Sequence, residues 1–437
     1  HRYVPGSLLL VSARVWGVLP SNSEVGFVAG SRRTYPRQAR GRAGLHMTYA
    51  EERTICDADS HLLELPDFFE QYAEPDMRQR LPEIGFYADT GPKLQHVLDR
   101  IRSAGGRHDD EHRAEMRDLG DSILSGPKGF KALGAFDGSD RRDVLDVLGF
   151  ERQMLFATFS AVVAFDMQEG ELAYAAARAH NRGVGEFCAH DSRLVGVGCV
   201  PMHDVDLALA ELDFALSQGL RAIWVPTSPW AGMSPGHGAW DGFYARLADA
   251  QVPFALHVGG HPRSLAPGWT NNGLALPRGF EEGGGEHIHA REMAALHHPA
   301  EVFLTAAIFD GVFERHPSLQ GVCVELGAGW VPQMLDRLDW VVDIWARNDD
   351  ALKALSAKPS EIAAQHLGFT PYVYEDVGSL ITQSSADLYM FSTDYPHAEG
   401  GRDPLRRFAA SLTKAEIDRP SQDKFFAGNL RRTLCET

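Results

Sequence analysis

The chain has 437 residues, of which 44% are hydrophobic and 23% are charged, an ordinary globular composition that excludes a collagen-like, coiled-coil or wholly disordered protein. The 59 acidic residues outnumber the 42 lysines and arginines, and the formal charge of −17 argues against a nucleic-acid-binding protein because a phosphate backbone would be repelled. No apolar run reaches the roughly 18 residues of a membrane-spanning helix, so we expect no membrane association.

The first 46 residues differ from the rest of the chain in charge. They carry seven arginines against one acidic residue, Glu24, and the first methionine of the chain is Met47. The apolar stretch near the start is interrupted by Arg14, which makes it a poor signal-peptide core. We interpret residues 1–46 as a basic leader that is disordered or foreign to the fold, and we place the folded domain at residues 47–437. An organellar transit peptide is the alternative.

The five cysteines are widely spaced along the chain and form no CxxC pair. Their number is odd, which does not suit a disulfide framework. The pattern therefore predicts reduced thiols and a cytoplasmic protein.

From residue 54 onward, short apolar segments alternate with longer segments of helical periodicity. Most of the short segments are apolar on both faces, which is typical of parallel strands covered by helices. The predicted strands are 54–59, 153–158, 194–200, 221–227, 253–258, 320–326, 368–374 and 387–393. Helical periodicity is clearest at 204–219 and 329–347. Eight strands with helices between them predict an α/β fold, a single (β/α)₈ barrel of the TIM type. An open doubly wound sheet is the alternative, but no GxGxxG motif supports it.

Two predicted connections are too long to be simple loops. Residues 65–140 contain a charged helical segment at 108–120, and residues 259–287 are rich in glycine and proline. Long loops in compact domains are usually functional or flexible. On a barrel these two would lie over the carboxyl ends of the strands, where sites are found. We therefore predict insertions over the C-terminal mouth of the barrel, with residues 259–287 as a lid.

Carboxylates and histidines stand at the predicted strand ends. The first strand ends in Asp57-Ala58-Asp59-Ser60-His61, and strand alternation sends Asp57, Asp59 and His61 to one face. The ends of the fifth, sixth and eighth strands supply His257, Glu325 and Asp394. A buried carboxylate without a cation or a donor is costly. The combination predicts one divalent metal ion, Zn²⁺ first, with Mn²⁺ as the alternative.

Five segments resemble the amidohydrolase-related family, in the branch that includes aminocarboxymuconate-semialdehyde decarboxylase. They are DADSHLLELPD (57–67), PFALHVGG (253–260), VELGAGWVPQMLDRLD (324–339), FSTDYPHAEGG (391–401) and FFAGNLRRTL (425–434). They occur in the family's order, over about residues 54–434. The resemblance implies a mononuclear metal enzyme, a small-molecule substrate and a homodimer.

The resemblance also implies roles for individual residues. Asp59, His61, His257 and Asp394 match the family's metal ligands, and Asp394 would act as general base. The family's decarboxylases place a histidine after the sixth strand, whereas this chain has Glu325 there. A carboxylate and an imidazole differ in charge at neutral pH, so this departure bears on the proton transfer.

Three further residues are candidates with alternatives. Glu325 could be a second base, an orienting group or a fifth ligand, or else a carboxylate that caps the following helix. Glu64 and His397 are candidates for substrate binding. Their alternatives are a first-turn helix acid for Glu64 and a structural loop residue for His397.

The predicted activity is metal-dependent hydrolysis of a small carboxylate, amide or ring-cleavage product, with water activated by the metal. The first alternative is a non-oxidative decarboxylase on the same scaffold. The second is a barrel that binds metal without catalysis. Release of CO₂, cleavage of amides or esters, and metal content distinguish the three hypotheses.

Overall fold

The computed structural model describes residues 48–84, 92–168, 170–260, 265–274 and 290–436. Residues 47–437 form one compact unit, and this unit alone is considered below. The predicted leader, residues 1–46, lies outside the described residues, as does most of the predicted lid at 259–287. Both therefore stay predictions.

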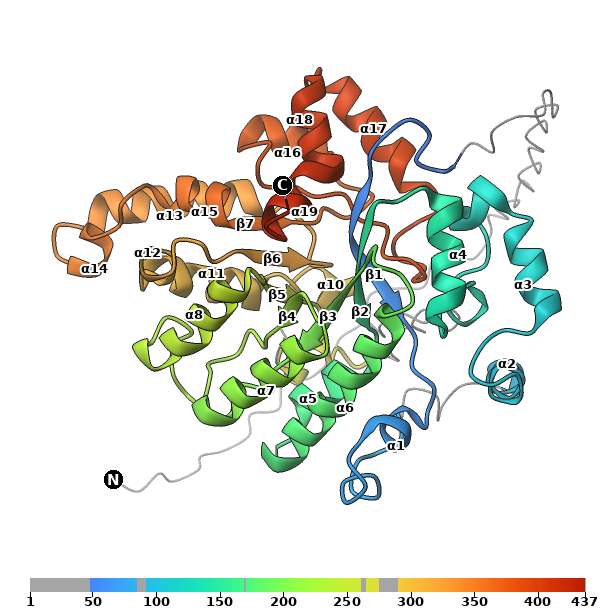
Figure 1. The fold of residues 1–437 in the computed structure, drawn as a ribbon. Coiled ribbons are helices and arrows are strands. Elements are labelled where there is room, and N and C mark those ends of the chain that lie inside the picture. Colours follow the sequence, from blue (N-terminus) through green and yellow to red (C-terminus); the bar gives the residue numbers. More distant parts are fainter. Residues whose placement is uncertain (1–47, 85–91, 169, 261–264, 275–289, 437) are drawn as a thin grey trace, which may run out of the picture. The chain divides into compact units, whose positions relative to one another are not determined.

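A parallel sheet forms the centre of this unit (Figure 1). The described residues contribute seven strands, which lie in the sheet in chain order, each parallel to the next. They are β1 (Cys56–Leu62), β2 (Arg152–Ala157), β3 (Leu194–Cys199), β4 (Ala222–Trp224), β5 (Phe254–His257), β6 (Gly321–Val324) and β7 (Leu367–Phe369). Each strand matches a predicted one, and almost every strand residue is buried, as the apolar sequence on both faces predicts.

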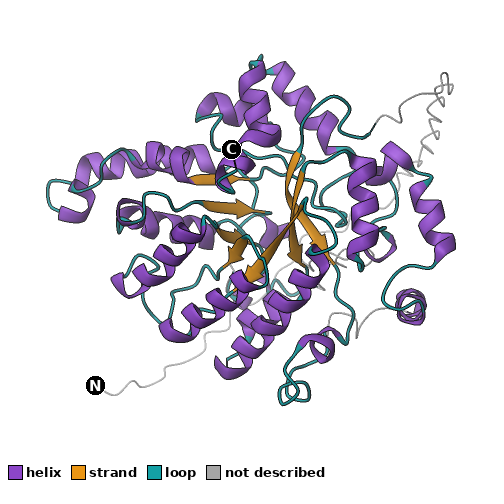
Figure 2. Cartoon of the chain, viewed as in Figure 1, coloured by secondary structure: helices purple, strands orange, loops and turns teal. Residues whose placement is uncertain are grey.

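Helices connect the strands and surround them (Figure 2). After β1 come α1 (Phe68–Tyr72), α2 (Pro92–Ser103), α3 (Asp110–Arg117), the 3₁₀ turns η2 (Gly120–Ser125) and η3 (Gly129–Lys131), and α4 (Gly138–Leu148). After β2, β3 and β4 come α5 (Ser160–Asp166), α6 (Gly170–Cys188), α7 (Val205–Ser217), η4 (Gly238–Trp240) and α8 (Asp241–Ala250). After β5 come α9 (Pro267–Thr270), α10 (Ala290–Met293), α11 (His298–Phe309) and α12 (Val312–Arg315).

The remaining helices follow β6 and β7. They are α13 (Val331–Trp345), α14 (Asp350–Lys353), α15 (Pro359–His366), α16 (Val377–Gln383), α17 (Pro404–Lys414), α18 (Arg419–Asp423), the π-helical turn η5 (Lys424–Gly428) and α19 (Asn429–Thr433). The predicted helices 204–219 and 329–347 are confirmed as α7 and α13. The start of α7 follows from its sequence, because the Asp204 side chain accepts hydrogen bonds from the backbone N–H groups of Asp206 and Leu207.

A continuous apolar core joins the sheet to the helices. Its largest fully buried side chains include Trp224, Trp230 and Trp240. All five cysteines are free thiols, as predicted. Within the described ranges, no helix is both long and apolar enough to cross a membrane.

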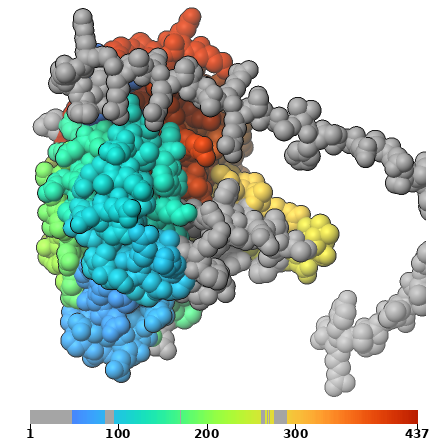
Figure 3. Space-filling view, turned by 90° about the vertical axis from the view of Figure 1, so that its right-hand side faces the viewer, coloured from blue at the N-terminus to red at the C-terminus, as the bar shows by residue number. Residues whose placement is uncertain are grey.

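The long connection between β1 and β2 is built mostly of helices. Its predicted helical segment at 108–120 contains α3, which Asp109 caps by accepting from the His112 N–H. Helices α1 (blue) and α2 and α3 (cyan) share one face of this unit in Figure 3. The Gly129 N–H donates to the Pro396 carbonyl at 2.8 Å, so this connection contacts the segment that follows β7.

The predicted eighth strand, 387–393, does not form a regular strand. The segment lies between β7 and β1 and makes one isolated bridge, Phe369 with Tyr389, and a second bridge, Ser60 with Tyr395, follows two residues after its end. Its backbone still bonds to both neighbours, since Met390 N donates to Phe369 O and Ala58 N donates to Phe391 O, each at 2.9 Å.

The cause of this interruption lies in the residues before and at Asp394. The Thr393 N–H donates to the Asp57 carboxylate at 2.9 Å instead of to a strand carbonyl. Asp394 itself has a φ of 51°, which lies outside the β region. The backbone hydrogen-bond pattern of the predicted strand therefore ends at Asp394, a residue that the sequence assigns to the metal site.

Candidate metal centre

Five of the predicted site residues converge at the carboxyl ends of the strands. Asp59 Oδ1 lies 3.2 Å from His61 Nε2 and 3.7 Å from His257 Nε2. Glu325 Oε2 lies 3.2 Å from His257 Nε2 and 3.5 Å from His61 Nε2. Asp394 Oδ1 lies 3.5 Å from His61 Nε2. Three carboxylates and two imidazoles therefore point at one small volume.

Backbone pairing brings these residues together. Asp394 N donates to Asp59 O at 2.8 Å, and His61 N donates to Tyr395 O at 2.7 Å, so the end of β1 is fixed against the segment after β7. His257 is the last residue of β5 and pairs in register with Val324, the last residue of β6. Glu325 follows Val324 directly, which places it beside His257.

The site contains buried polar atoms that suit a cation. Asp59, His61 and His257 are 1–2% exposed. Asp59 Oδ1, His61 Nε2 and His257 Nε2 have no hydrogen-bond partner within the described part of the chain. Unsatisfied buried polar atoms are costly, and carboxylate oxygens with imidazole nitrogens are the donor set of Zn²⁺ and Mn²⁺ sites. The residues present therefore fit a divalent metal ion.

Both histidines present Nε2 to the cluster. His257 Nδ1 donates to the Val258 carbonyl at 2.9 Å, which orients its Nε2 toward the other side chains of the site. Burial, followed by the nearby His397 and His257 side chains, lowers the pKa of His61 well below its ordinary value. His61 is therefore a neutral imidazole at neutral pH, the form that ligates a metal.

Two carboxylates of the site stand on unusual backbone. Glu325 has a φ of 53° and Asp394 a φ of 51°, both in the left-handed region that disfavours side chains with a Cβ. Such conformations cost roughly 1–3 kcal/mol each and cluster at functional sites. The strain at these two positions supports a functional role for both.

His397 belongs to the cluster as well. Its ring stacks on His61 with centroids 3.9 Å apart, and its Nδ1 lies 3.0 Å from Asp394 Oδ1. The Thr158 hydroxyl donates to the Leu62 carbonyl, so it accepts from His397 Nε2 at 3.1 Å. Burial lowers the pKa of His397, but the charge and hydrogen bond of Asp394 outweigh burial and raise the pKa above its ordinary value. Asp394 therefore favours the protonated form of the His397 imidazole.

Glu64 stands apart from the cluster. Its carboxylate is buried and accepts the backbone N–H groups of Thr158, Phe159 and Ser160 at 3.1, 3.0 and 2.6 Å, at the start of α5. This geometry gives Glu64 a structural role, and the predicted contact with substrate stays untested.

Glu399 was not among the predicted site residues. It lines a cavity of about 20 Å³ with Asp59, Glu325 and Asp394, and its Oε2 is buried without a hydrogen-bond partner in the described residues. Burial, followed by the charge of Asp394, raises the pKa of Glu399. Glu399 lies in a loop five residues after Asp394 and not at the end of a predicted strand, so the strand pattern of the sequence does not point to it.

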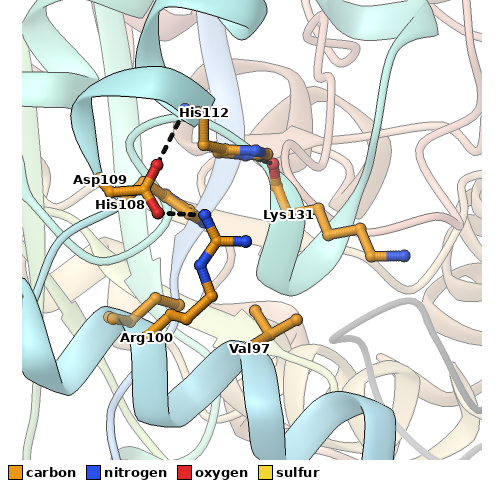
Figure 4. Close-up of a pocket in the computed structure, with 7 residues that line it drawn as sticks. Val97, Arg100, His108, Asp109, His112 and Lys131 are labelled. Atoms are coloured by element: carbon orange, nitrogen blue, oxygen red, sulfur yellow. Dashed lines mark hydrogen bonds and ion pairs between the residues drawn. The ribbon is translucent and has the colours of Figure 1, made fainter.

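A second cavity, of about 140 Å³, lies in the connection between β1 and β2 (Figure 4). Its lining includes Val97, Arg100, His108, Asp109, His112 and Lys131. Asp109 pairs with Arg100, and the His108 and His112 rings donate to the carbonyls of Phe130 and Lys131. These polar groups are engaged in holding the connection together.

The fold and the cluster define a class, namely parallel β/α proteins with a candidate divalent metal centre at the strand carboxyl ends. The amidohydrolase family matches residues 56–434, so the chain belongs to this family, and the resemblance is confirmed. No curated protein matches the chain significantly.

Several solved structures share the fold. An amidohydrolase from Mycobacterium avium subsp. paratuberculosis is 21% identical over 88% of this chain and 100% of its own, with a TM-score of 0.64. The 2,6-dihydroxybenzoate decarboxylase from Rhizobium is 17% identical over 88% and 99%, with a TM-score of 0.55. The 5-carboxyvanillate decarboxylase from Novosphingobium aromaticivorans, complexed with manganese, is 17% identical over 89% and 98%, with a TM-score of 0.56.

Proposed function

We propose that this protein is a divalent-metal-dependent, non-oxidative decarboxylase of a hydroxylated aromatic carboxylic acid. The observation that carries the proposal is the buried cluster of carboxylates and imidazoles at the strand ends. The structural neighbours named above favour this reaction, the first alternative from the sequence, over hydrolysis.

Asp59, His61, His257 and Asp394 would hold the metal. The bound cation would attract substrate oxygens and stabilise negative charge that develops on them. The manganese in the related 5-carboxyvanillate decarboxylase and the share of carboxylates in the cluster favour Mn²⁺ over the predicted Zn²⁺.

Decarboxylation replaces the C–CO₂⁻ bond by C–H, so one proton must reach the ring carbon as CO₂ leaves. Asp394 Oδ1 lies 3.0 Å from His397 Nδ1, and its charge stabilises a proton on the His397 imidazole. Thr158 orients the imidazole by accepting from Nε2. We assign this pair as the proton reservoir of the reaction.

The test is CO₂ release from 2,6-dihydroxybenzoate and 5-carboxyvanillate by the Mn²⁺-loaded protein. A panel of amide and ester substrates runs in parallel. We expect CO₂ release that stops on chelation and returns with Mn²⁺. Cleavage of amides or esters without CO₂ release would restore the hydrolase hypothesis, and metal binding without either reaction would support the barrel that binds metal without catalysis. The homodimer and the cytoplasmic location remain predictions from the sequence.

A further inference from the structure

Glu325 occupies the centre of the cluster. Two groups of side chains have ligand atoms within 4.8 Å of one another, Asp59–His61–His257–Glu325 and His61–Glu325–Asp394–His397. His61 and Glu325 are the members that both groups share. Glu325 is 9% exposed. Glu325 stands where the family's decarboxylases have a histidine, and its carboxylate therefore belongs to both groups of ligand atoms.

We propose that Glu325 is a ligand of the metal ion rather than a base, and that the loop after β7, residues 370–375, holds it in this position. This inference rests on the metal centre of the proposed function, but not on the reaction assigned to it.

The separations within the cluster support ligation. Ligand atoms bound at about 2.1 Å to one cation lie about 3.0–3.6 Å apart for angles of roughly 90–120° at the cation. Glu325 Oε2 lies 3.2 Å from His257 Nε2 and 3.5 Å from His61 Nε2. The same atoms of His61 and His257 lie 3.2 and 3.7 Å from Asp59 Oδ1. Glu325 Oε2 therefore lies at distances from the two imidazole nitrogens that are similar to those of Asp59 Oδ1.

The orientation of His257 points the same way. Its Nδ1 donates to the Val258 carbonyl at 2.9 Å, which turns Nε2 toward the cluster, 3.2 Å from Glu325 Oε2. A cation bound by both atoms would compensate the burial of the two side chains.

The loop after β7 fixes the backbone of Glu325 on both sides of its Cα. The Glu325 N–H donates to Thr370 Oγ1 at 3.1 Å, and the Tyr372 hydroxyl donates to the Glu325 carbonyl at 3.0 Å. These bonds hold a residue whose φ of 53° is strained for any side chain with a Cβ. A fixed backbone fixes the direction of the carboxylate.

Glu375 anchors the same loop to the residues after Glu325. Its carboxylate accepts the N–H groups of Ala328 and Gly329 at 2.9 and 2.7 Å, and that of Tyr372 at 2.7 Å. A Cβ at Gly327 would lie 2.8 Å from the Tyr372 ring, so only glycine allows this approach. Tyr372 is therefore a positioning residue that acts on the metal through Glu325.

The experiment is a titration of the metal-free full chain with Mn²⁺, in which electron paramagnetic resonance measures the free ion. The variants are Glu325→Gln, Tyr372→Phe and, as a matched control, Tyr374→Phe, whose ring is 69% exposed on the same loop. The visible absorption of the Co²⁺-loaded proteins reports the ligand set, and thermal unfolding reports the fold.

We expect Glu325→Gln to weaken Mn²⁺ binding at least about 10-fold and to change the Co²⁺ spectrum. Tyr372→Phe should weaken Mn²⁺ binding by about 3- to 10-fold and alter the spectrum while the Tm stays close to that of the wild type. Tyr374→Phe should change neither.

Wild-type Mn²⁺ affinity and an unchanged Co²⁺ spectrum in Glu325→Gln would overturn the proposal, and reduced CO₂ release in that variant would then mark Glu325 as a base. Should Glu325→Gln fail to fold, wild-type behaviour of Tyr372→Phe overturns the positioning claim. If metal binding depends on Glu325 but the protein releases no CO₂, the proposed reaction is refuted and the proposal that Glu325 is a ligand stands.

Discussion

Asp394 is the residue at which the metal cluster and the proton reservoir meet. Its Oδ1 lies 3.5 Å from His61 Nε2 and 3.0 Å from His397 Nδ1. Its left-handed backbone is fixed by the bond from its N–H to Asp59 O. One carboxylate oxygen therefore faces both a neutral imidazole and an imidazole whose pKa is raised.

Asp394→Asn should separate proton transfer from metal binding. The amide keeps one oxygen toward the cluster but loses the charge and the basicity, so we expect kcat to fall by about 10²–10⁴. Metal binding should weaken without being abolished, because Asp59, His61 and His257 remain. His257→Ala should instead lose metal first and activity as a consequence. Metal stoichiometry measured beside kcat distinguishes these outcomes, and full metal content with wild-type turnover in Asp394→Asn would remove this residue from the mechanism.

At the residue scale, the sequence predicts those members of the cluster that stand at strand ends. Asp59, His61 and His257 lie within β1 and β5, and Glu325 follows β6 by one residue, so parallel pairing alone brings them together. Glu399 and the loop after β7 could not be predicted in this way. Their places depend on loop conformations and side-chain hydrogen bonds, which periodicity does not encode.

Among the elements, α5 depends on a buried carboxylate at its start. Glu64 accepts the N–H groups of Thr158, Phe159 and Ser160, which lie directly before α5 and at its first residue. We expect Glu64→Gln to lower the free energy of unfolding by about 2 kcal/mol, since charge-assisted bonds are replaced by weaker ones. The exposed Glu70→Gln is the control. Chemical denaturation measures the loss, and an unchanged stability with a raised KM would instead favour substrate binding by Glu64.

His180 makes the packing of α6 on β3 sensitive to acid. It lies fully buried in α6, its Nε2 donates to the Val197 carbonyl at 3.2 Å, and its Nδ1 accepts from the Ser160 hydroxyl at 2.8 Å. Burial lowers the pKa of His180 to about 4, against the opposing effect of the bond to Val197. The native state therefore holds this imidazole neutral, with one acceptor nitrogen for Ser160.

Stability should fall as the pH drops through this window. Between about pH 6.5 and 4 the unfolded chain binds a proton at His180 that the folded chain does not, so folding loses about 3 kcal/mol over this range. His180→Asn carries no such titration. The difference in free energy of unfolding between wild type and variant should shrink toward pH 4, and a difference that is independent of pH would contradict this assignment.

The predicted elements failed where the site interrupts regular structure. Seven strands could be predicted because most are apolar runs and nearly all of their residues are buried. The eighth segment, 387–393, contains the apolar run Leu388–Phe391, but Asp57 takes the Thr393 N–H and Asp394 leaves the β region. The Thr393 N–H thus bonds to the Asp57 carboxylate instead of to a neighbouring strand, and this bond supports the site. An apolar sequence pattern cannot reveal such an exchange of partners.

At the scale of the whole molecule, the fold is closed by contacts between its first and last parts. The Tyr49 hydroxyl donates to Asp403 at 3.0 Å and accepts from the Leu405 N–H at 2.9 Å. The Tyr49 N–H donates to the Val147 carbonyl, and Ala50 is 1% exposed. The native contacts of the compact unit therefore extend to within a few residues of Met47.

The boundary of the folded domain follows from these contacts. A chain that starts at Met47 keeps Tyr49 and Ala50, so we expect a Tm within about 2 °C of the full chain and the same Mn²⁺ stoichiometry. A chain that starts at Arg53 loses the Tyr49 bonds and one core side chain, and its Tm should fall by several degrees, because each kcal/mol lost at this size shifts the Tm by about 2 °C. Thermal unfolding of the three proteins, with metal content measured beside it, makes the comparison. A chain from Met47 that melts many degrees lower would show that residues 1–46 contribute to the native fold, whereas equal melting of both truncated chains would place the boundary beyond Tyr49.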